Sequence, residues 1–149
     1  MPIGEICNRE VVFVGRDDTV QEAARLMRQH HVGDLVVAED RGGVRYPVGM
    51  LTDRDLVVEV LAAGVDIDTV SVGDIMSTDP AVARESDGIY DTIQRMRARA
   101  VRRIPVVGGH GELVGIVAVD DLLELLADEI MGLAALAGRE QAHERRARR

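Results

Sequence analysis

The chain has 149 residues, a formal net charge of -8 and one cysteine, Cys7. A chain of this length can bury a proper core as one domain or two small subdomains, and a lone cysteine favours a reducing compartment. The acidic balance, with one Phe, two Tyr and no Trp, argues against a general nucleic-acid surface. No signal-peptide pattern begins the chain and no apolar stretch is long enough to span a bilayer, so we expect a cytoplasmic protein.

The first predicted elements lie in residues 7–64. Residues 7–14 are expected to form a lead-in strand, and apolar residues at helical spacing follow from Val20 to Met27. Two short strands are predicted at residues 34–38 and 46–51, on either side of a Gly-rich turn. A second helix begins after Thr52, and Gly64 is expected to end it.

The second set of elements repeats the first. Residues 76–83 supply a lead-in strand, residues 89–96 carry the helical pattern, and strands are predicted at residues 103–107 and 113–118 before a final helix. Leu35 and Ile104 are equivalent at an offset of 69 residues, and Gly49 and Gly115 at an offset of 66. The offset falls by three because the first copy has the longer turn, as expected for a surface loop.

Two copies of a small sheet with helices can close a core by packing together. The sequence therefore predicts an α+β fold made of two tandem β-α-β-β-α repeats related by a pseudo-two-fold axis, with clefts between the copies. We expect the first repeat at residues 1–66, the second at residues 67–138 and a basic flexible tail at residues 139–149. The tail holds five arginines and two glutamates.

The tandem units, the stretch "VRRIPVV" and the Gly-apolar-apolar-Thr-x-x-Asp motif together resemble a pair of cystathionine-beta-synthase (CBS) domains, a Bateman module. The resemblance covers about Ile3 to Met131. It implies a stand-alone, non-enzymatic regulatory protein that binds AMP, ADP, ATP, NAD or S-adenosylmethionine between the repeats, with no obligatory cofactor. It also implies a disc-shaped homodimer that signals to an unknown effector protein, with neither a membrane nor a nucleic acid expected as a partner.

The resemblance also implies a ligand site. In it, Thr52 and Asp55 would contact phosphate or ribose, and the second repeat would supply the base pocket and basic side chains. From the motif come Gly49, Met50, Thr52, Arg54 and Asp55, and from the second repeat come Asp87, Val101, Arg102, Arg103, Ile104 and Pro105. From the residues themselves, Thr52 and Asp55 also have the form of a helix cap.

The second copy of the motif, "GIVAVDD", has Ala118 in place of the threonine. Acidic residues without a basic partner are expected in that cleft, which disfavours a phosphate by like-charge repulsion. Val32, Asp34 and Asp121 therefore form at most a weaker second site, for an uncharged or zwitterionic ligand. We expect no metal site, because the adjacent His30 and His31 point in different directions at a helix end.

Two other functions are compatible with the residues. The first is an interaction module with empty clefts, in which Thr52 and Asp55 only cap a helix. The second is a transcription-linked regulator that approaches nucleic acid through its arginine-rich tail. No arrangement of residues in the sequence indicates a catalytic site.

Overall fold

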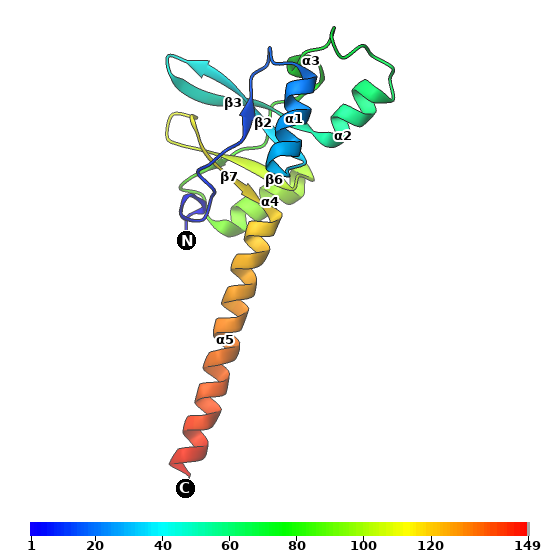
Figure 1. The fold of residues 1–149 in the computed structure, drawn as a ribbon. Coiled ribbons are helices and arrows are strands. Elements are labelled where there is room, and N and C mark those ends of the chain that lie inside the picture. Colours follow the sequence, from blue (N-terminus) through cyan, green and yellow to red (C-terminus); the bar gives the residue numbers. More distant parts are fainter. Residues whose placement is uncertain (149) are drawn as a thin grey trace. The chain divides into compact units, whose positions relative to one another are not determined.

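The computed structural model describes residues 1–148 (Figure 1). The chain divides into two compact units, residues 1–117 and the remainder from Ala118 onward. The first unit contains both sheets and all of the short helices. The second unit is the C-terminal helix, which is described separately below.

The first repeat contains seven elements, among them the predicted hairpin and helices. They are a 3-10 turn η1 (Ile3–Glu5), β1 (Phe13–Val14), α1 (Val20–His30), β2 (Asp34–Arg41), β3 (Val44–Thr52), α2 (Asp53–Asp55) and a π-helix η2 (Leu56–Leu61). The Thr19 hydroxyl accepts a hydrogen bond of 3.1 Å from the Glu22 N–H and so begins α1. Gly64, the predicted end of the second helix, has φ +67.

The second repeat follows the same plan. Its elements are α3 (Val72–Ile75), β4 (Ser77–Thr78), β5 (Ala83–Arg84), α4 (Ile89–Arg99), β6 (Arg103–Val107) and β7 (Leu113–Ala118). The equivalence extends to backbone details, because His31 after α1 and Ala100 after α4 have φ 54 and 52 in the left-handed region. These two residues are 69 positions apart and end their helices in the same way.

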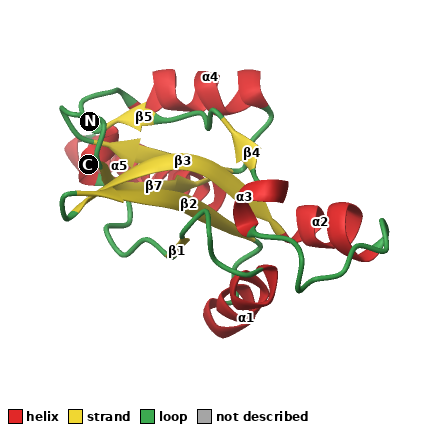
Figure 2. Cartoon of the chain, turned by 90° about the horizontal axis from the view of Figure 1, so that it is seen from above, coloured by secondary structure: helices red, strands yellow, loops and turns green. Residues whose placement is uncertain are grey.

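The strands form two sheets (Figure 2), with the orders β1-β2-β3-β4 and β5-β6-β7. In the first sheet, β2 and β3 are a long antiparallel hairpin with an irregularity between Val37 and Ala38. The strand β1 lies parallel to β2, and β5 lies parallel to β6. This pairing confirms the predicted α+β fold of two similar units.

The start of each repeat crosses to the other repeat. Ile3 donates its N–H to the Asp87 carbonyl at 2.7 Å, and Asn8 forms a bridge with Ile116 of β7. In the opposite direction, Val72 donates its N–H to the Asp18 carbonyl at 2.9 Å. The strand β4 likewise pairs with β3 of the first repeat. The N-terminal segments are therefore exchanged between the two halves.

This exchange corrects the predicted lead-in strands. The sequence analysis expects one continuous strand at residues 7–14 and another at residues 76–83. In the structure each segment serves two sheets, because its first part pairs with the other repeat and its second part, β1 or β5, pairs with its own. A chain that changes sheets cannot stay in one straight strand.

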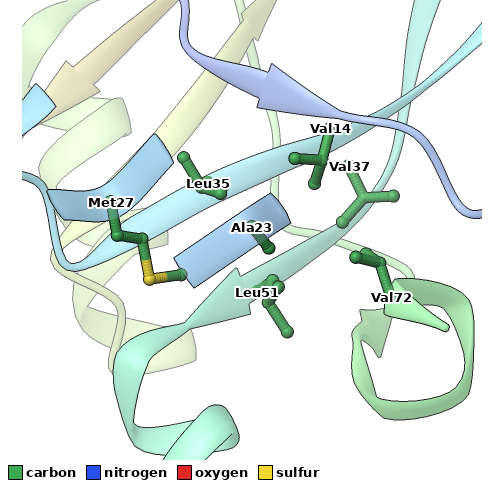
Figure 3. Packing of buried hydrophobic residues seen from close by; sticks show 7 residues of the cluster. All are labelled: Val14, Ala23, Met27, Leu35, Val37, Leu51 and Val72. Carbon is green, nitrogen blue, oxygen red and sulfur yellow. The ribbon is translucent and has the colours of Figure 1, made fainter. Parts of the chain in front are cut away.

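The core of the first sheet shows what the exchange contributes (Figure 3). Its buried members are Val14, Ala23, Met27, Leu35, Val37, Leu51 and Val72. Six of these residues belong to the first repeat, whereas Val72 belongs to the segment that begins the second. The two halves therefore share side chains as well as backbone hydrogen bonds.

The second unit is α5 (Val119–Ala147), a helix of 29 residues. The Ala118 N–H donates to Asp121 Oδ2 at 3.0 Å at its start. The flexible tail predicted from residue 139 is helical as far as Ala147, and Arg149 lies outside the described residues. Alanine, glutamate, glutamine and arginine favour helix, which explains why the charged segment continues α5. Within residues 1–148, no helix is apolar over enough of its length to cross a membrane.

Candidate functional site

Thr52 and Asp55 form the predicted helix cap at the end of β3. The Thr52 hydroxyl accepts the Asp55 N–H at 3.1 Å, and Asp55 Oδ2 accepts the Thr52 N–H at 2.9 Å. Both residues are half-buried, and Arg54 between them is exposed. The cap fixes a hydroxyl and a carboxylate together, and Asp55 Oδ1 takes no part in it.

Gly49 has a packing role that the sequence analysis did not recognise. A Cβ atom added there would lie 2.6 Å from Met76 Sδ and 2.7 Å from the Ser77 carbonyl oxygen. At the equivalent Gly115, a Cβ atom would lie 2.6 Å from Cys7 Sγ. The crossing segments thus pass directly over both glycines, and the close approach requires glycine without any ligand.

The remaining predicted site residues lie in different surroundings. Met50 and Val101 are half-buried, and Arg102 is exposed. In contrast, Ile104 and Pro105 are fully buried within β6. These two side chains belong to the core, so they present no exposed surface to a ligand.

Asp87 anchors the turn before α4. Its Oδ2 accepts the Arg84 N–H at 2.9 Å and the Arg95 Nη1 at 2.8 Å. Burial raises the pKa of Asp87. The hydrogen bond from the Arg84 N–H, together with the hydrogen bond and charge of Arg95, lowers the pKa by more than burial raises it. The pKa of Asp87 therefore lies below its usual value. In the first repeat, Asp18 similarly accepts the Gly15 N–H at 2.7 Å.

Asp34 and Arg103 form an ion pair between the repeats, with 2.5 Å between Arg103 Nε and Asp34 Oδ1. The contact lacks hydrogen-bond alignment, since Asp34 Oδ1 is buried without a hydrogen-bond partner. The two residues are 69 positions apart, so each occupies the other's equivalent position. A residue that touches its own copy lies beside the pseudo-two-fold axis.

Opposing effects act on the ionisation of Asp34. Burial raises its pKa, the charge of Arg103 lowers it, the neighbouring Asp53 raises it again and Arg102 lowers it, and the pKa ends above its usual value. The expectation that this cleft holds acids without a basic partner is therefore wrong. A local alignment of the copies could not reveal this cross-repeat pair.

A cavity of about 510 Å³ opens beside this ion pair. Its lining comes from both repeats and combines an apolar group with a polar one. The apolar residues are Val11, Val12, Phe13, Val32 and Ile116, and the polar residues are Asn8, Glu10, His30, Asp34 and Arg103. The phenyl ring of Phe13 lies under the Arg45 guanidinium, 4.3 Å from its ring centre.

This cavity contains part of the predicted second site. Val32 and Asp34 line it, together with Arg103, which was assigned to the first site. Asp121 belongs to the separate C-terminal unit. Sequence reasoning missed the residues from Asn8 to Phe13 because it treated them only as a strand. It placed His30 correctly at the end of α1 but gave it no part in a site.

In residues 1–148, no group of three or more His, Cys, Asp or Glu side chains is arranged to hold a metal ion. His31 occupies the left-handed position after α1, so it ends that helix.

Comparison with protein families identifies the class. The model of the CBS domain matches residues 3–62 and 72–128, so the chain belongs to the CBS domain family and is a tandem CBS pair. CBS pairs are regulatory modules, and small CBS proteins are generally not catalytic. An inosine-5'-monophosphate dehydrogenase of Methanocaldococcus jannaschii matches over 22% of its own length, which is only its CBS part.

Several relatives share most of the chain. The CBS domain-containing protein YhcV of Bacillus subtilis is 39% identical over 126 residues, which cover 84% of this chain and 86% of that protein. Hypoxic response protein 1 of Mycobacterium tuberculosis is 36% identical over 124 residues, covering 83% and 84%. An uncharacterized protein of Methanopyrus kandleri is 32% identical over 123 residues, and the chain spans 61% of its length.

Solved structures show the same fold. The crystal structure of Hypoxic Response Protein I, which holds two coordinated zinc ions, has a TM-score of 0.74 at 34% identity and covers 83% of this chain and 98% of that one. A CBS domain pair crystallised with 5'-methylthioadenosine and S-adenosyl-L-methionine has a TM-score of 0.74 at 21% identity, covering 87% and 98%. At that identity the second likeness concerns the fold alone.

Proposed function

We propose that this chain is a non-enzymatic regulatory module that binds an adenosine-containing ligand between its CBS repeats and signals to a partner protein. The observation that carries the proposal is the cavity of about 510 Å³, whose walls come from both repeats. This volume lies within the range of small-molecule sites, which are mostly apolar with a few converging polar groups. A ligand in this cavity would alter the contacts between the two repeats.

The walls of the cavity suit a purine and a ribose. Phe13, Val32 and Ile116 provide an apolar surface against which a flat base can pack. Carboxylates at Glu10 and Asp34 can accept hydrogen bonds from ribose hydroxyls or an amino group. Since Arg103 is already paired with Asp34, the cavity favours an uncharged or zwitterionic adenosine derivative over a polyphosphate.

The capped helix start at Thr52 and Asp55 is the proposed site for an anionic nucleotide, with AMP, ADP, ATP or NAD as candidates. A capped helix start bears a hydroxyl and a positive dipole end, although the helix is short. Arg54 and Arg102 are exposed basic residues of the predicted set. A related fold crystallised with S-adenosyl-L-methionine supports adenosine ligands for this class of module.

A cytoplasmic homodimer is part of the proposal. Apolar side chains at Val57, Val58 and Leu61 of η2 are exposed, which leaves an uncovered apolar surface on the first repeat. Such surfaces mark contacts with other proteins. We expect a second copy to cover this surface and an effector protein to sense the ligated state.

The test is a thermal-shift and calorimetric screen with AMP, ADP, ATP, NAD and S-adenosylmethionine. Val32→Trp and Val101→Trp form a matched pair, because the two valines are equivalent in the repeats and Val32 lines the cavity whereas Val101 does not. A ligand at about 100 times its dissociation constant adds roughly 2.7 kcal/mol of stability. We expect Val32→Trp to abolish the response to a ligand of the cavity and Val101→Trp to leave it intact.

Asp55→Ala reports separately on the Thr52 cleft. It should weaken an anionic nucleotide and leave a ligand of the 510 Å³ cavity unaffected. If the wild-type protein ignores every compound, the ligand proposal fails and the chain is better explained as an interaction module with empty clefts.

A further inference from the structure

The helix α5 continues well beyond the part of the chain that resembles its family. The family match ends at residue 128, whereas α5 runs to Ala147. Along this extension Ile130, Met131, Leu133 and Leu136 are 62 to 69% exposed. In proteins, most of the stability of a helix comes from packing an apolar face against a partner. An exposed helix with these residues therefore calls for a partner.

The apolar residues follow one face of the helix. Leu126, Ile130, Leu133 and Ala137 are spaced by four, three and four residues, which is the seam of a two-helix coiled coil. Leu136 lies beside this seam. This spacing indicates that the partner is another helix, because a narrow apolar seam on one helix packs best against a similar seam on a second helix.

The charges along α5 indicate which helix can be its partner. Residues 119–129 contain five acids and no basic residue. Residues 139–148 contain four arginines and two glutamates. Two parallel copies would place acidic halves together, whereas two antiparallel copies place each acidic half against a basic half. The helix is therefore complementary in charge to an inverted copy of itself.

We propose that α5 pairs with α5 of a second copy in an antiparallel, two-fold symmetric coiled coil. Ile130 then lies opposite Leu133 of the other copy and Leu126 lies opposite Ala137, so that each layer joins two residues of the seam. An isologous contact of this kind closes on itself and produces a defined dimer. The pairing uses none of the residues assigned to the ligand clefts or to the apolar surface on η2, so it can be tested independently of the proposed function.

Cysteine crosslinking in the full chain reads this contact directly. In a Cys7→Ser background, Leu126→Cys and Ala137→Cys chains are mixed and treated with a short bis-maleimide. The antiparallel arrangement gives a crosslink between the two different chains and almost none within either variant alone. Glu140→Cys, mixed in the same way with Leu126→Cys, covers a register displaced by about one turn. Crosslinks of each variant with itself would show a parallel pair, and no crosslink in any mixture would show that another occupant covers α5; both results overturn the proposal.

Charge reversal provides a second measurement that does not depend on register. Arg139→Glu, Arg145→Glu and Arg146→Glu together should lower the yield of crosslinked pairs about tenfold, because all segments at the contact become acidic. Adding Glu124→Arg, Asp128→Arg and Glu129→Arg to the same chain should restore the yield. Circular dichroism of both variants confirms that α5 remains helical. An unchanged yield in the first variant, or no recovery in the second, contradicts charge-matched pairing.

Discussion

At the scale of single residues, Asp87 shows how one carboxylate stabilises the start of a helix. Its pKa is lowered, so the folded protein holds its ionised form more strongly than the unfolded chain does. The stabilisation is present above the unfolded pKa near 3.8 and is lost as the pH falls through the lower folded value. Asp87→Asn should cost about 1–2 kcal/mol at pH 7 and progressively less in acid.

Asp18 is the matched control for this prediction. It accepts the same backbone hydrogen bond, from Gly15, but Leu26 occupies the position equivalent to Arg95. Asp18→Asn should therefore cost less than Asp87→Asn when both are followed by urea unfolding over a pH series. Equal losses would mean that the Arg95 contact contributes nothing measurable.

Asp34 should behave in the opposite way. Burial is the largest effect on its pKa, which lies above the usual value even though Arg103 opposes the rise. The folded state binds the proton more tightly, so this contribution to stability is complete below the unfolded pKa near 3.8 and is lost as the pH rises through the folded value. The free energy of unfolding of the wild type, minus that of Asp34→Asn, should therefore fall with rising pH across this window.

Arg103→Gln tests the cause of that behaviour. Arg103→Gln removes the charge that lowers the pKa of Asp34, so Asp34 should lose its proton at a higher pH. The free energy of unfolding of Arg103→Gln, minus that of the double variant Arg103→Gln/Asp34→Asn, should therefore keep falling to a higher pH than the corresponding difference in the wild type. A difference between wild type and Asp34→Asn that grows with pH would show that Arg103 outweighs burial.

At the scale of elements, the glycines of β3 and β7 are required by the segments that cross them. Gly49→Ala would place a Cβ atom 2.6 Å from Met76 Sδ and 2.7 Å from the Ser77 carbonyl oxygen, so the strand or its neighbour must shift. We expect a loss of about 1–3 kcal/mol in chemical unfolding. Gly115→Ala should cause a similar loss, because the added Cβ atom would lie 2.6 Å from Cys7 Sγ.

Suppressor variants separate the atoms responsible. Cys7→Ala should recover most of the loss in Gly115→Ala, because the nearest backbone oxygen is 3.0 Å away, at Asn8. Met76→Ala should recover less in Gly49→Ala, where the Ser77 oxygen remains at 2.7 Å. If Gly49→Ala kept full stability but lost the response to nucleotides, the glycine would serve the ligand instead.

The helices and strands of both repeats could be predicted because their signals are local. Spacing of apolar residues gave α1 and α4, and the Thr52 cap gave the start of α2. The crossing of the N-terminal segments has no local signal, since it depends on pairings between distant parts of the chain. The repeated stretches "IGEI" and "VGDI", 69 residues apart, were the available clue that each half begins earlier than its first helix.

The same distinction between local and long-range contacts applies to the candidate site. The hydroxyl and carboxylate of Thr52 and Asp55 are joined by short-range hydrogen bonds, which sequence spacing predicts. The pair of Asp34 and Arg103 is formed across the axis between the repeats, so neither its existence nor the adjoining cavity could be obtained from spacing within one copy. The sequence predicted a cleft of acids because Arg103 was assigned to the first cleft, so its contact with Asp34 was left out.

At the scale of the first unit, the exchanged segments make each repeat depend on the beginning of the other. Ile3 is fully buried and its N–H is bonded to Asp87 of the second repeat, whereas the equally buried Val72 is bonded to Asp18 of the first. Ile3→Ala should cost about 2–5 kcal/mol through the cavity that it leaves, and Val72→Ala somewhat less. The two changes remove equivalent side chains from opposite halves, so they form a matched pair.

Hydrogen exchange should show where each half loosens. In Ile3→Ala the faster amides should lie in residues 84–88 and 114–116, beside the segment that carries the mutation. In Val72→Ala they should lie in residues 15–19 and 49–51, which the other crossing segment contacts. Local opening of this kind precedes global unfolding and is confined to the contacts that were weakened. The reverse pattern, in which Ile3→Ala loosened the first repeat, would mean that each N-terminal segment stabilises its own half, and the exchange would then be without energetic consequence.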